Sequence, residues 1–158
     1  GEDMKIWVDA DALPGEIKEI ILRAARRLKI ETILVANKNV AISPGPFVSL
    51  VRVTKGADVA DAYIHEQAAA EDLCVTADIP LAHALVGRGL TVIDPRGELY
   101  SEANIGERLA VRDLMSGLRE VGVQTGGPPP FNPKAKQKFA ALLDSVLSKA
   151  LRRAAPPA

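Results

Sequence analysis

Two carboxylates in Asp-x-Asp spacing are the first residues of the chain whose types and positions could do chemistry. Asp9 ends the apolar run from Lys5, Asp11 follows in the next turn, and Pro14 then opens a helical pattern. A buried strand that ends in acids delivers them to the carboxyl edge of an α/β sheet, where such folds build their sites. Asp9 alone could cap the following turn, but the second acid favours a site.

Three further acids are expected at the same edge. Asp58 and Asp61 begin the helical pattern after the third expected strand, and Asp78 follows the fourth. Because the carboxyl ends of parallel strands meet at one edge, the loops that hold these acids should converge. Each acid also has a local alternative, since Asp58 with Asp61 has the spacing of a capping box and Asp78 could cap the next helix. Agreement across separate loops favours a shared site.

Such a cluster needs a cation. Carboxylates that converge with no Lys or Arg nearby in the sequence repel one another strongly at short range. Oxygen-only ligands suit Mg²⁺ or Mn²⁺ rather than zinc, and such an ion can activate water and stabilise the leaving oxygen in phosphodiester hydrolysis. The pattern therefore predicts a catalytic Mg²⁺ or Mn²⁺ site. Its expected ligands and catalytic residues are Asp9, Asp11, Asp58, Asp61 and Asp78.

Polar residues next to the acids are candidates for substrate binding. Asn37 and Thr76 end the second and fourth expected strands, where they could bind a ligand or orient a metal-bound water, or could equally be local hydrogen bonders. Arg96 and the basic last helix could hold a substrate backbone, although a solvated outer face is the simpler interpretation of the helix. Its basic residues are Lys134, Lys136, Lys138, Lys149, Arg152 and Arg153. Asp94, before Pro95, is expected to be a turn residue.

The elements that must position these residues alternate between strand and helix. Strands are expected at Lys5–Asp9, Glu31–Ala36, Phe47–Val53, Leu73–Thr76 and Leu90–Ile93, with helices over Gly15–Lys29, after Asp58 to Ala70, and over Ile79–Val86. This alternation predicts an α/β fold with a mainly parallel five-stranded sheet of order 3-2-1-4-5, flanked by helices. The connection between the second and third strands is short and lacks helical periodicity.

The alternation stops after Gly97, and two helices are expected beyond it. They cover Ala103–Val121 and residues 133 to about 153, so we expect an α/β domain over residues 4–100 and a helical extension over residues 101–153. The last helix has an apolar stripe that includes Phe139, Leu143 and Leu147. That stripe must dock on the sheet domain or on a partner subunit.

Composition bounds the partners and the compartment. Net charge is zero, but residues 1–97 hold 11 basic against 14 acidic side chains and residues 98–158 hold 9 against 6. Aromatic residues are only 4% of the chain, so nucleic-acid binding would be backbone-driven and salt-sensitive. The single cysteine, Cys74, excludes an intramolecular disulfide. With no apolar run long enough to span a bilayer, we expect a soluble cytoplasmic protein without membrane contact; its oligomeric state stays open.

Two motifs resemble those of a known family. They are Trp7-Val8-Asp9-Ala10-Asp11-Ala12 and Val75-Thr76-Ala77-Asp78-Ile79-Pro80-Leu81-Ala82. Both resemble signatures of the YaiI/YqxD family of uncharacterised bacterial proteins, which is grouped with PIN-like nuclease domains. The segments 94–98 and 126–128 continue the likeness, which covers Met4 to about Leu147.

The PIN-like resemblance also extends to the acids. The segment 55–60 is similar to the acidic helix start of the NYN branch of these nucleases, 61–64 to their Asp-x-x-Ile helix, and 76–78 to their Thr-x-Asp after the fourth strand. It implies Asp9, Asp78 and either Asp58 or Asp61 as metal ligands, with Asp11 as a further candidate. It thus implies a metal-dependent nuclease, with RNA as the expected substrate.

One departure and two alternatives remain. Leu13 stands where the family usually has cysteine, so any redox or ligand role of that thiol is lost in this chain. The acids could instead form a non-catalytic pocket for a cation or small ligand. They could also be helix caps in a protein-interaction domain whose basic last helix docks on a partner. Whether the chain is an enzyme is therefore open from its sequence.

Overall fold

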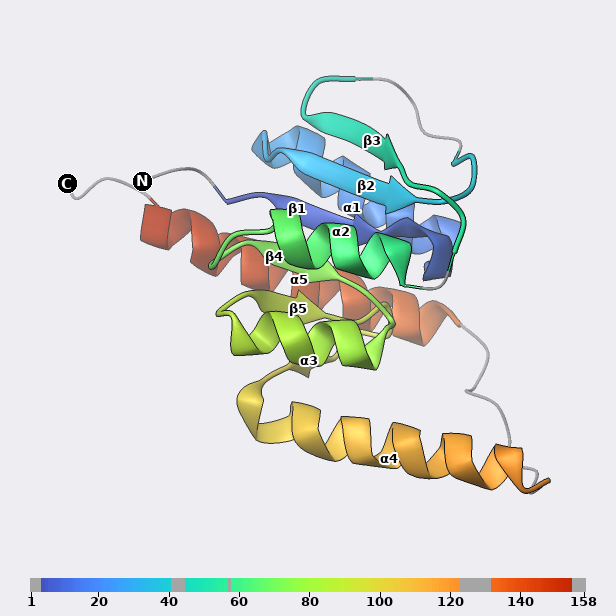
Figure 1. Cartoon of the computed structure of the whole chain (residues 1–158). Coiled ribbons are helices and arrows are strands. Elements are labelled where there is room, and N and C mark those ends of the chain that lie inside the picture. The colour runs from blue at the N-terminus through green and yellow to red at the C-terminus, as the bar shows by residue number, and fades with distance from the viewer. Residues whose placement is uncertain (1–3, 41–44, 57, 123–131, 155–158) are drawn as a thin grey trace.

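Six strands form one sheet, and helices cover both of its faces (Figure 1). The computed structural model describes residues 4–40, 45–56, 58–122 and 132–154. The strands are β1 (Ile6–Asp9), β2 (Thr32–Ala36), β3 (Val48–Arg52), β4 (Leu73–Val75), β5 (Thr91–Ile93) and β6 (Leu99–Tyr100). Their spatial order is β3-β2-β1-β4-β5-β6. The expected order 3-2-1-4-5 is confirmed for the first five strands, which pair in parallel.

The helices begin and end close to the positions that their periodicity predicts. They are η1 (Ala10–Ala12), a short 3₁₀ helix, α1 (Gly15–Leu28), α2 (Val59–Gln67), α3 (Ile79–Gly87), α4 (Glu102–Glu120) and α5 (Pro133–Ala154). Among the described helices, none is both long and apolar enough to cross a membrane.

The expectation of five strands was wrong, because the turn after β5 leads into a hairpin. β6 pairs antiparallel with β5, Tyr100 opposite Val92 and Leu99 opposite Ile93. In the turn, the Asp94 N–H donates to the Glu98 carbonyl and the Gly97 N–H to the Asp94 carbonyl. A strand of two residues is too short to show an alternating hydrophobic pattern, so the sequence carries no signal for it.

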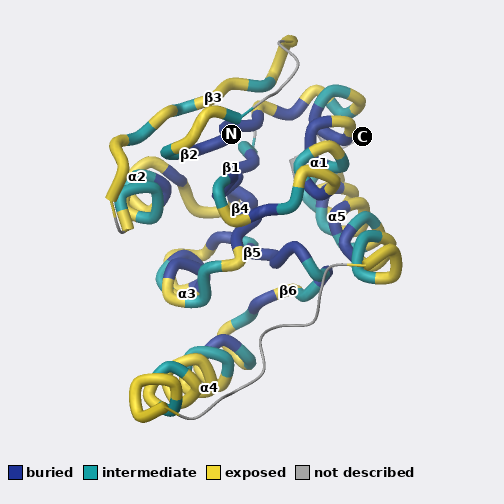
Figure 2. The backbone as a smooth tube through the Cα atoms, turned by 90° about the vertical axis from the view of Figure 1, so that its right-hand side faces the viewer, coloured by how far each residue is buried: buried dark blue, intermediate teal, exposed yellow. Residues whose placement is uncertain are grey.

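The two faces of the sheet are separated by the alternation of side chains along each strand. Ile6 and Val8 of β1 lie in a core with α1 and α5, whereas Trp7 lies in a second core with α2, α3 and the start of α4. The sheet is therefore the middle of three layers. Figure 2 shows buried residues concentrated along β1, β2, β4 and β5 and on the inner sides of these helices, whereas the edge strand β3 is largely exposed.

The stripe on α5 docks back onto the sheet domain. Phe139, Leu143 and Leu147 are each at most 1% exposed and belong to the core that α1 shares with the strands. The start of the helix also lies tightly against the β5–β6 turn, because a Cβ on Gly97 would come within 2.7 Å of Lys138 Cγ and 2.8 Å of the Phe139 nitrogen. This close approach fixes the first turns of α5 beside that turn.

α4 behaves differently from α5. Its start is anchored by Ile105, which is 3% exposed. Four large apolar side chains further along, Val111, Leu114, Met115 and Val121, are 39–75% exposed. Figures 1 and 2 show α4 at the periphery of the molecule, with most of its length exposed.

Candidate metal centre

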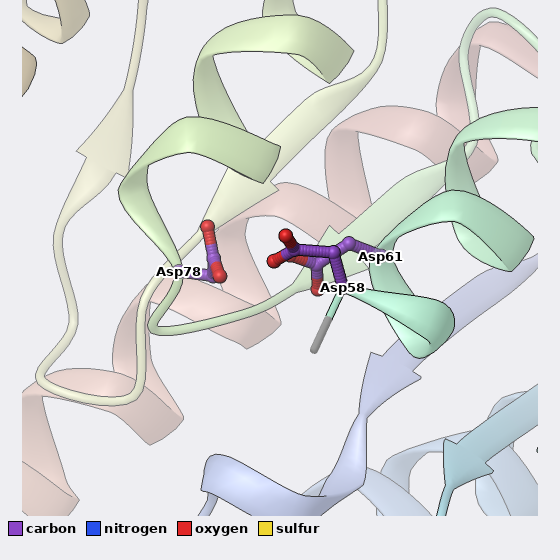
Figure 3. A group of neighbouring side chains, drawn as sticks. All are labelled: Asp58, Asp61 and Asp78. Atoms are coloured by element: carbon purple, nitrogen blue, oxygen red, sulfur yellow. The ribbon is translucent and has the colours of Figure 1, made fainter. Parts of the chain in front are cut away.

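Three carboxylates from two helix starts form the centre of the site (Figure 3). Asp58 and Asp61 come from the start of α2 and Asp78 from the start of α3. One carboxylate oxygen from each residue lies within 4.8 Å of the other two. Opposite oxygen ligands of Mg²⁺ are about 4 Å apart, so small side-chain rotations would bring all three around one cation.

Asp58 enters this group through an unusual backbone conformation. Its φ is +63°, in the left-handed region that L residues seldom adopt, and its carboxylate accepts no capping hydrogen bond from α2. The capping-box interpretation of Asp58 with Asp61 was therefore wrong. The Asp58 carboxylate makes no capping bond to α2 and lies with its oxygen in the cluster.

Asp78 serves the helix and the cluster together. One of its oxygens, Oδ1, accepts a hydrogen bond of 2.9 Å from the Leu81 backbone N–H, so the predicted N-cap is confirmed. A carboxylate has two oxygens with several acceptor positions. Capping therefore fixes the orientation of Asp78 without removing it from the cluster.

Thr76 connects the cluster to Asp9, which lies at the tip of β1. The Thr76 hydroxyl donates to Asp9 Oδ2 at 2.8 Å and accepts from the Asp78 backbone N–H at 3.0 Å. Thr76 is fully buried and Asp9 is 6% exposed. The structure thus gives Thr76 a position from which it orients two of the acids, with its hydroxyl shielded from solvent.

Two of these acids, Asp61 and Asp9, have raised pKa values, through burial first and neighbouring carboxylates second. The pKa of Asp61 is raised to about 7, mainly by burial and next by a hydrogen bond with Asp78 and by the charge of Asp78. The charges of Asp9 and Asp58 act in the same direction. Burial also raises the pKa of Asp9, against the effect of the Thr76 hydrogen bond and with the effect of the Asp78 and Asp11 charges. A cation in their midst would relieve this repulsion.

Asp11 lies in η1, next to the cluster rather than in its centre. Its Oδ2 accepts the backbone N–H of Asn37 at 2.7 Å, which ties the ends of β1 and β2 together. Its Oδ1 is buried and has no hydrogen-bond partner within the described residues. A buried acceptor without a donor is a position that a cation could satisfy. The contact recorded for Asn37 comes from its backbone.

A lysine that sequence reasoning missed lies beside this turn. The Lys18 ammonium group donates a hydrogen bond of 3.5 Å to the carbonyl oxygen of Ala10, the residue before Asp11. In the sequence, Lys18 looks like any polar position of an amphipathic helix.

The remaining candidates lie outside the central group. Arg96 is in the β5–β6 turn, where its backbone N–H donates to Asp94 Oδ1, as does the Glu98 N–H, so the turn role of Asp94 is confirmed. Leu13, 6% exposed, packs in the core on the α1 side. The residue that replaces the usual cysteine is therefore a core residue here. The donors around the cluster are all carboxylate oxygens, which fits Mg²⁺ or Mn²⁺.

Comparisons with known proteins identify relatives along nearly the whole chain. A family model described as "Uncharacterized BCR, YaiI/YqxD family" matches residues 7–149. A UPF0178 protein of Geobacter sulfurreducens is 56% identical over 151 residues, which cover 95% of this chain and 100% of the relative. A UPF0178 protein of Trichlorobacter lovleyi is 54% identical over 151 residues, with 96% and 98% covered. No solved structure matches.

Proposed function

Since the chain belongs to the YaiI/YqxD family, whose description names no activity, we propose a function from the site itself. The chain is a PIN-like nuclease that hydrolyses phosphodiester bonds, with RNA as the expected substrate and Mg²⁺ or Mn²⁺ as the cofactor. The observation that carries this proposal is the group of Asp58, Asp61 and Asp78 with carboxylate oxygens within 4.8 Å of one another.

The position of this group in the fold supports the proposal. β1 and β4 are neighbours at the centre of the sheet, where the strand order reverses, and open α/β sheets bind ligands outside that point. Asp9 ends β1, and Asp78 follows β4. The order of β1 to β5, with acids at these strand ends, is also the feature that favours a PIN-like assignment.

Each residue has a separate task in this proposal. Asp58, Asp61 and Asp78 hold the cation, Asp9 and Asp11 add negative charge beside them, and Thr76 fixes two of these acids. A bound ion would lower the pKa of a water and would stabilise the charge that develops on the leaving oxygen. Burial and the neighbouring carboxylates raise the pKa of Asp61 to about 7 in the metal-free chain, and a bound cation would favour its ionised form, in which Asp61 can act as a ligand.

The proposal is tested first by calorimetric titration with Mn²⁺. We expect one site in the wild-type chain, and at least 100-fold weaker binding in Asp61→Asn and in Asp9→Asn/Asp78→Asn. Asn retains an oxygen that can accept the bonds from Thr76 and Leu81. The matched control is Asp113→Asn, which removes an exposed acid from α4. Equal binding in all variants would remove the basis of the proposal.

A cleavage assay separates an enzyme from a binding module. Labelled single-stranded RNA is incubated with Mn²⁺ and each variant, and we expect cleavage by the wild type and by Asp113→Asn only. Metal binding without turnover over a range of RNA substrates would favour a non-catalytic cation-binding module. In either case we propose a cytoplasmic location, where the single buried Cys74 stays reduced.

Protein interaction is a second candidate function, favoured by one observation. Val111, Leu114, Met115 and Val121 expose apolar surface along α4. Sites of contact with other proteins often combine such surface with a polar rim. Wild-type behaviour of the Asp9→Asn/Asp78→Asn variant in cells, together with loss of function in Leu114→Asp, would favour this alternative.

A further inference from the structure

α5 carries basic side chains in two groups of three, one at each end. Lys134, Lys136 and Lys138 lie in its first two turns; its last two turns hold Lys149, Arg152 and Arg153. Figure 1 shows the helix beginning on the side toward which the strand arrows point and ending on the opposite side. The first group therefore lies at the edge of the sheet that carries the acids, and the second group at the other edge.

A direct contact connects the first group with the β5–β6 turn. A Cβ on Gly97 would lie 2.7 Å from Lys138 Cγ, so the residue next to Arg96 touches the start of α5. β5 is the neighbour of β4, the strand that leads to Thr76 and Asp78. The turn and the cluster therefore lie at the same edge of the sheet, whereas α5 packs on the face that α1 covers and the cluster lies at the starts of α2 and α3, which cover the other face. A strand that contacts both must pass around this edge of the sheet.

The stability of α5 does not account for these lysines. Cations are unfavourable near a helix N-terminus, where the backbone dipole is already positive, and the first turn of α5 contains no acid. Asn132 caps the helix by accepting the Ala135 N–H at 2.9 Å. Within the described residues, none of the three lysines forms an ion pair. The second group, in contrast, lies at the C-terminal end of α5, where positive charges stabilise a helix.

We propose that Lys134, Lys136, Lys138 and Arg96 form the surface that holds the phosphate backbone of a single-stranded nucleic acid on its way into the carboxylate cluster. Lys134 and Lys138 are exposed, and Lys136 and Arg96 are partly exposed. Lysine binds phosphate as a point charge without reading bases. This inference rests on the proposed function for the phosphodiester substrate, and it assigns the nucleic-acid strand a path from the start of α5 past the β5–β6 turn to the carboxylate cluster.

The two ends of α5 provide a matched test in the full-length chain. Fluorescence anisotropy measures the affinity for a labelled single-stranded RNA in EDTA at several salt concentrations. We compare the wild type with Lys134→Gln/Lys136→Gln/Lys138→Gln and with the control Lys149→Gln/Arg152→Gln/Arg153→Gln. Both variants lose three positive charges, so any difference between them reports position rather than net charge.

The expected result is at least a tenfold loss of affinity in the first variant and less than a twofold loss in the control. The slope of log affinity against log salt should fall by about 2 in the first variant, since each phosphate contact to a single strand contributes about 0.7. Thermal melting shows whether both variants fold. Equal losses in the two variants, or no binding by the wild type at low salt, would overturn the inference.

This test is independent of catalysis. If RNA binding depends on the first group but no cleavage occurs in Mn²⁺, the proposed nuclease activity is refuted and the proposed phosphate-binding surface is supported. If the first variant cleaves RNA with an unchanged KM, the proposed phosphate-binding surface is refuted and the proposed nuclease activity is supported. A DNA strand of the same sequence identifies the source of the phosphates. Equal affinity supports backbone contacts alone, and tighter RNA binding supports an additional contact to the 2′-hydroxyl.

Discussion

Asp72 and Asp61 are aspartates at opposite edges of the same sheet, and the chain surrounds them differently. Asp72, just before β4, is 5% exposed and accepts three hydrogen bonds, from Trp7 Nε1 at 2.9 Å and from the backbone N–H groups of Lys5 and Ala69 at 3.0 Å. Asp61, in the first turn of α2, has carboxylates for neighbours, which with burial raise its pKa to about 7.

The difference separates a structural acid from an acid of the candidate site. Donors around a buried carboxylate stabilise its charge and connect the elements that supply them, here the start of β1 and the first residues after α2. Acids crowded against acids lower the stability of the free chain, and such strain is typical of sites that wait for a ligand. Burial alone therefore does not distinguish the two acids; what distinguishes Asp61 is that its neighbours are carboxylates.

The largest effect that this comparison predicts is on stability. Asp72→Ala leaves three donors, one buried and two partly buried, without an acceptor, and we expect the free energy of unfolding to fall by about 3 kcal/mol. Asp61→Ala removes the same charge from the crowded edge, and we expect no loss or a gain of about 1 kcal/mol at pH 8. Urea denaturation of both variants measures the difference. A similar loss in Asp61→Ala would show that both acids are structural.

The sequence predicts which acids lie at the carboxyl edge of the sheet better than it predicts the backbone conformation and the contacts of each acid. Asp9 and Asp78 could be placed because strand ends are readable from apolar runs. The sequence could not show that Asp58 would adopt a left-handed conformation, since an Asp before a helix is an ordinary candidate for the N-cap. The role of Asp72 was also missed, because its donors, Trp7 and Lys5, are more than 60 residues away in the sequence.

Short elements explain the rest of the fold that was missed. The order of five strands follows from alternation and from right-handed crossovers, which act over many residues. β6 has two residues, and only its pairing with β5 makes it a strand. The docking of α5 depends on the absence of a side chain at Gly97, and in the sequence Gly97 signals no more than a turn.

A smaller effect is expected in the dependence of stability on pH. The folded-state pKa of Asp61, about 7, lies above its unfolded value of 3.8. Between these values the folded chain holds more protons than the unfolded chain, so stability falls as pH rises and levels off above pH 7. Because Asp61 is partly open to water, we expect a loss of about 1 kcal/mol between pH 5.5 and 8.

The pH effect has its own control. Urea denaturation of Asp61→Asn at the two pH values should show most of this decline removed, because the amide does not titrate. His65 and His83 are exposed and present in both proteins, so their contribution cancels in the comparison. An equal decline in the wild type and in Asp61→Asn would place the titrating group elsewhere and refute the crowding of Asp61.

The smallest effects on stability and on Mn²⁺ affinity are expected at Asp94. This residue tests whether an acid must be crowded by other carboxylates, or need only lie at the carboxyl edge of the sheet, to bind the cation. Asp94 follows β5 at the edge that also carries the cluster, and burial raises its pKa, but its Oδ1 accepts the N–H groups of Arg96 and Glu98. In Asp94→Asn the amide oxygen can accept both bonds, so the free energy of unfolding should change by no more than about 0.5 kcal/mol. Calorimetry should show an unchanged Mn²⁺ affinity, because Asp94 lies outside the group of Asp58, Asp61 and Asp78. Weaker Mn²⁺ binding in Asp94→Asn would mean that the whole carboxyl edge, rather than three crowded acids within it, holds the cation.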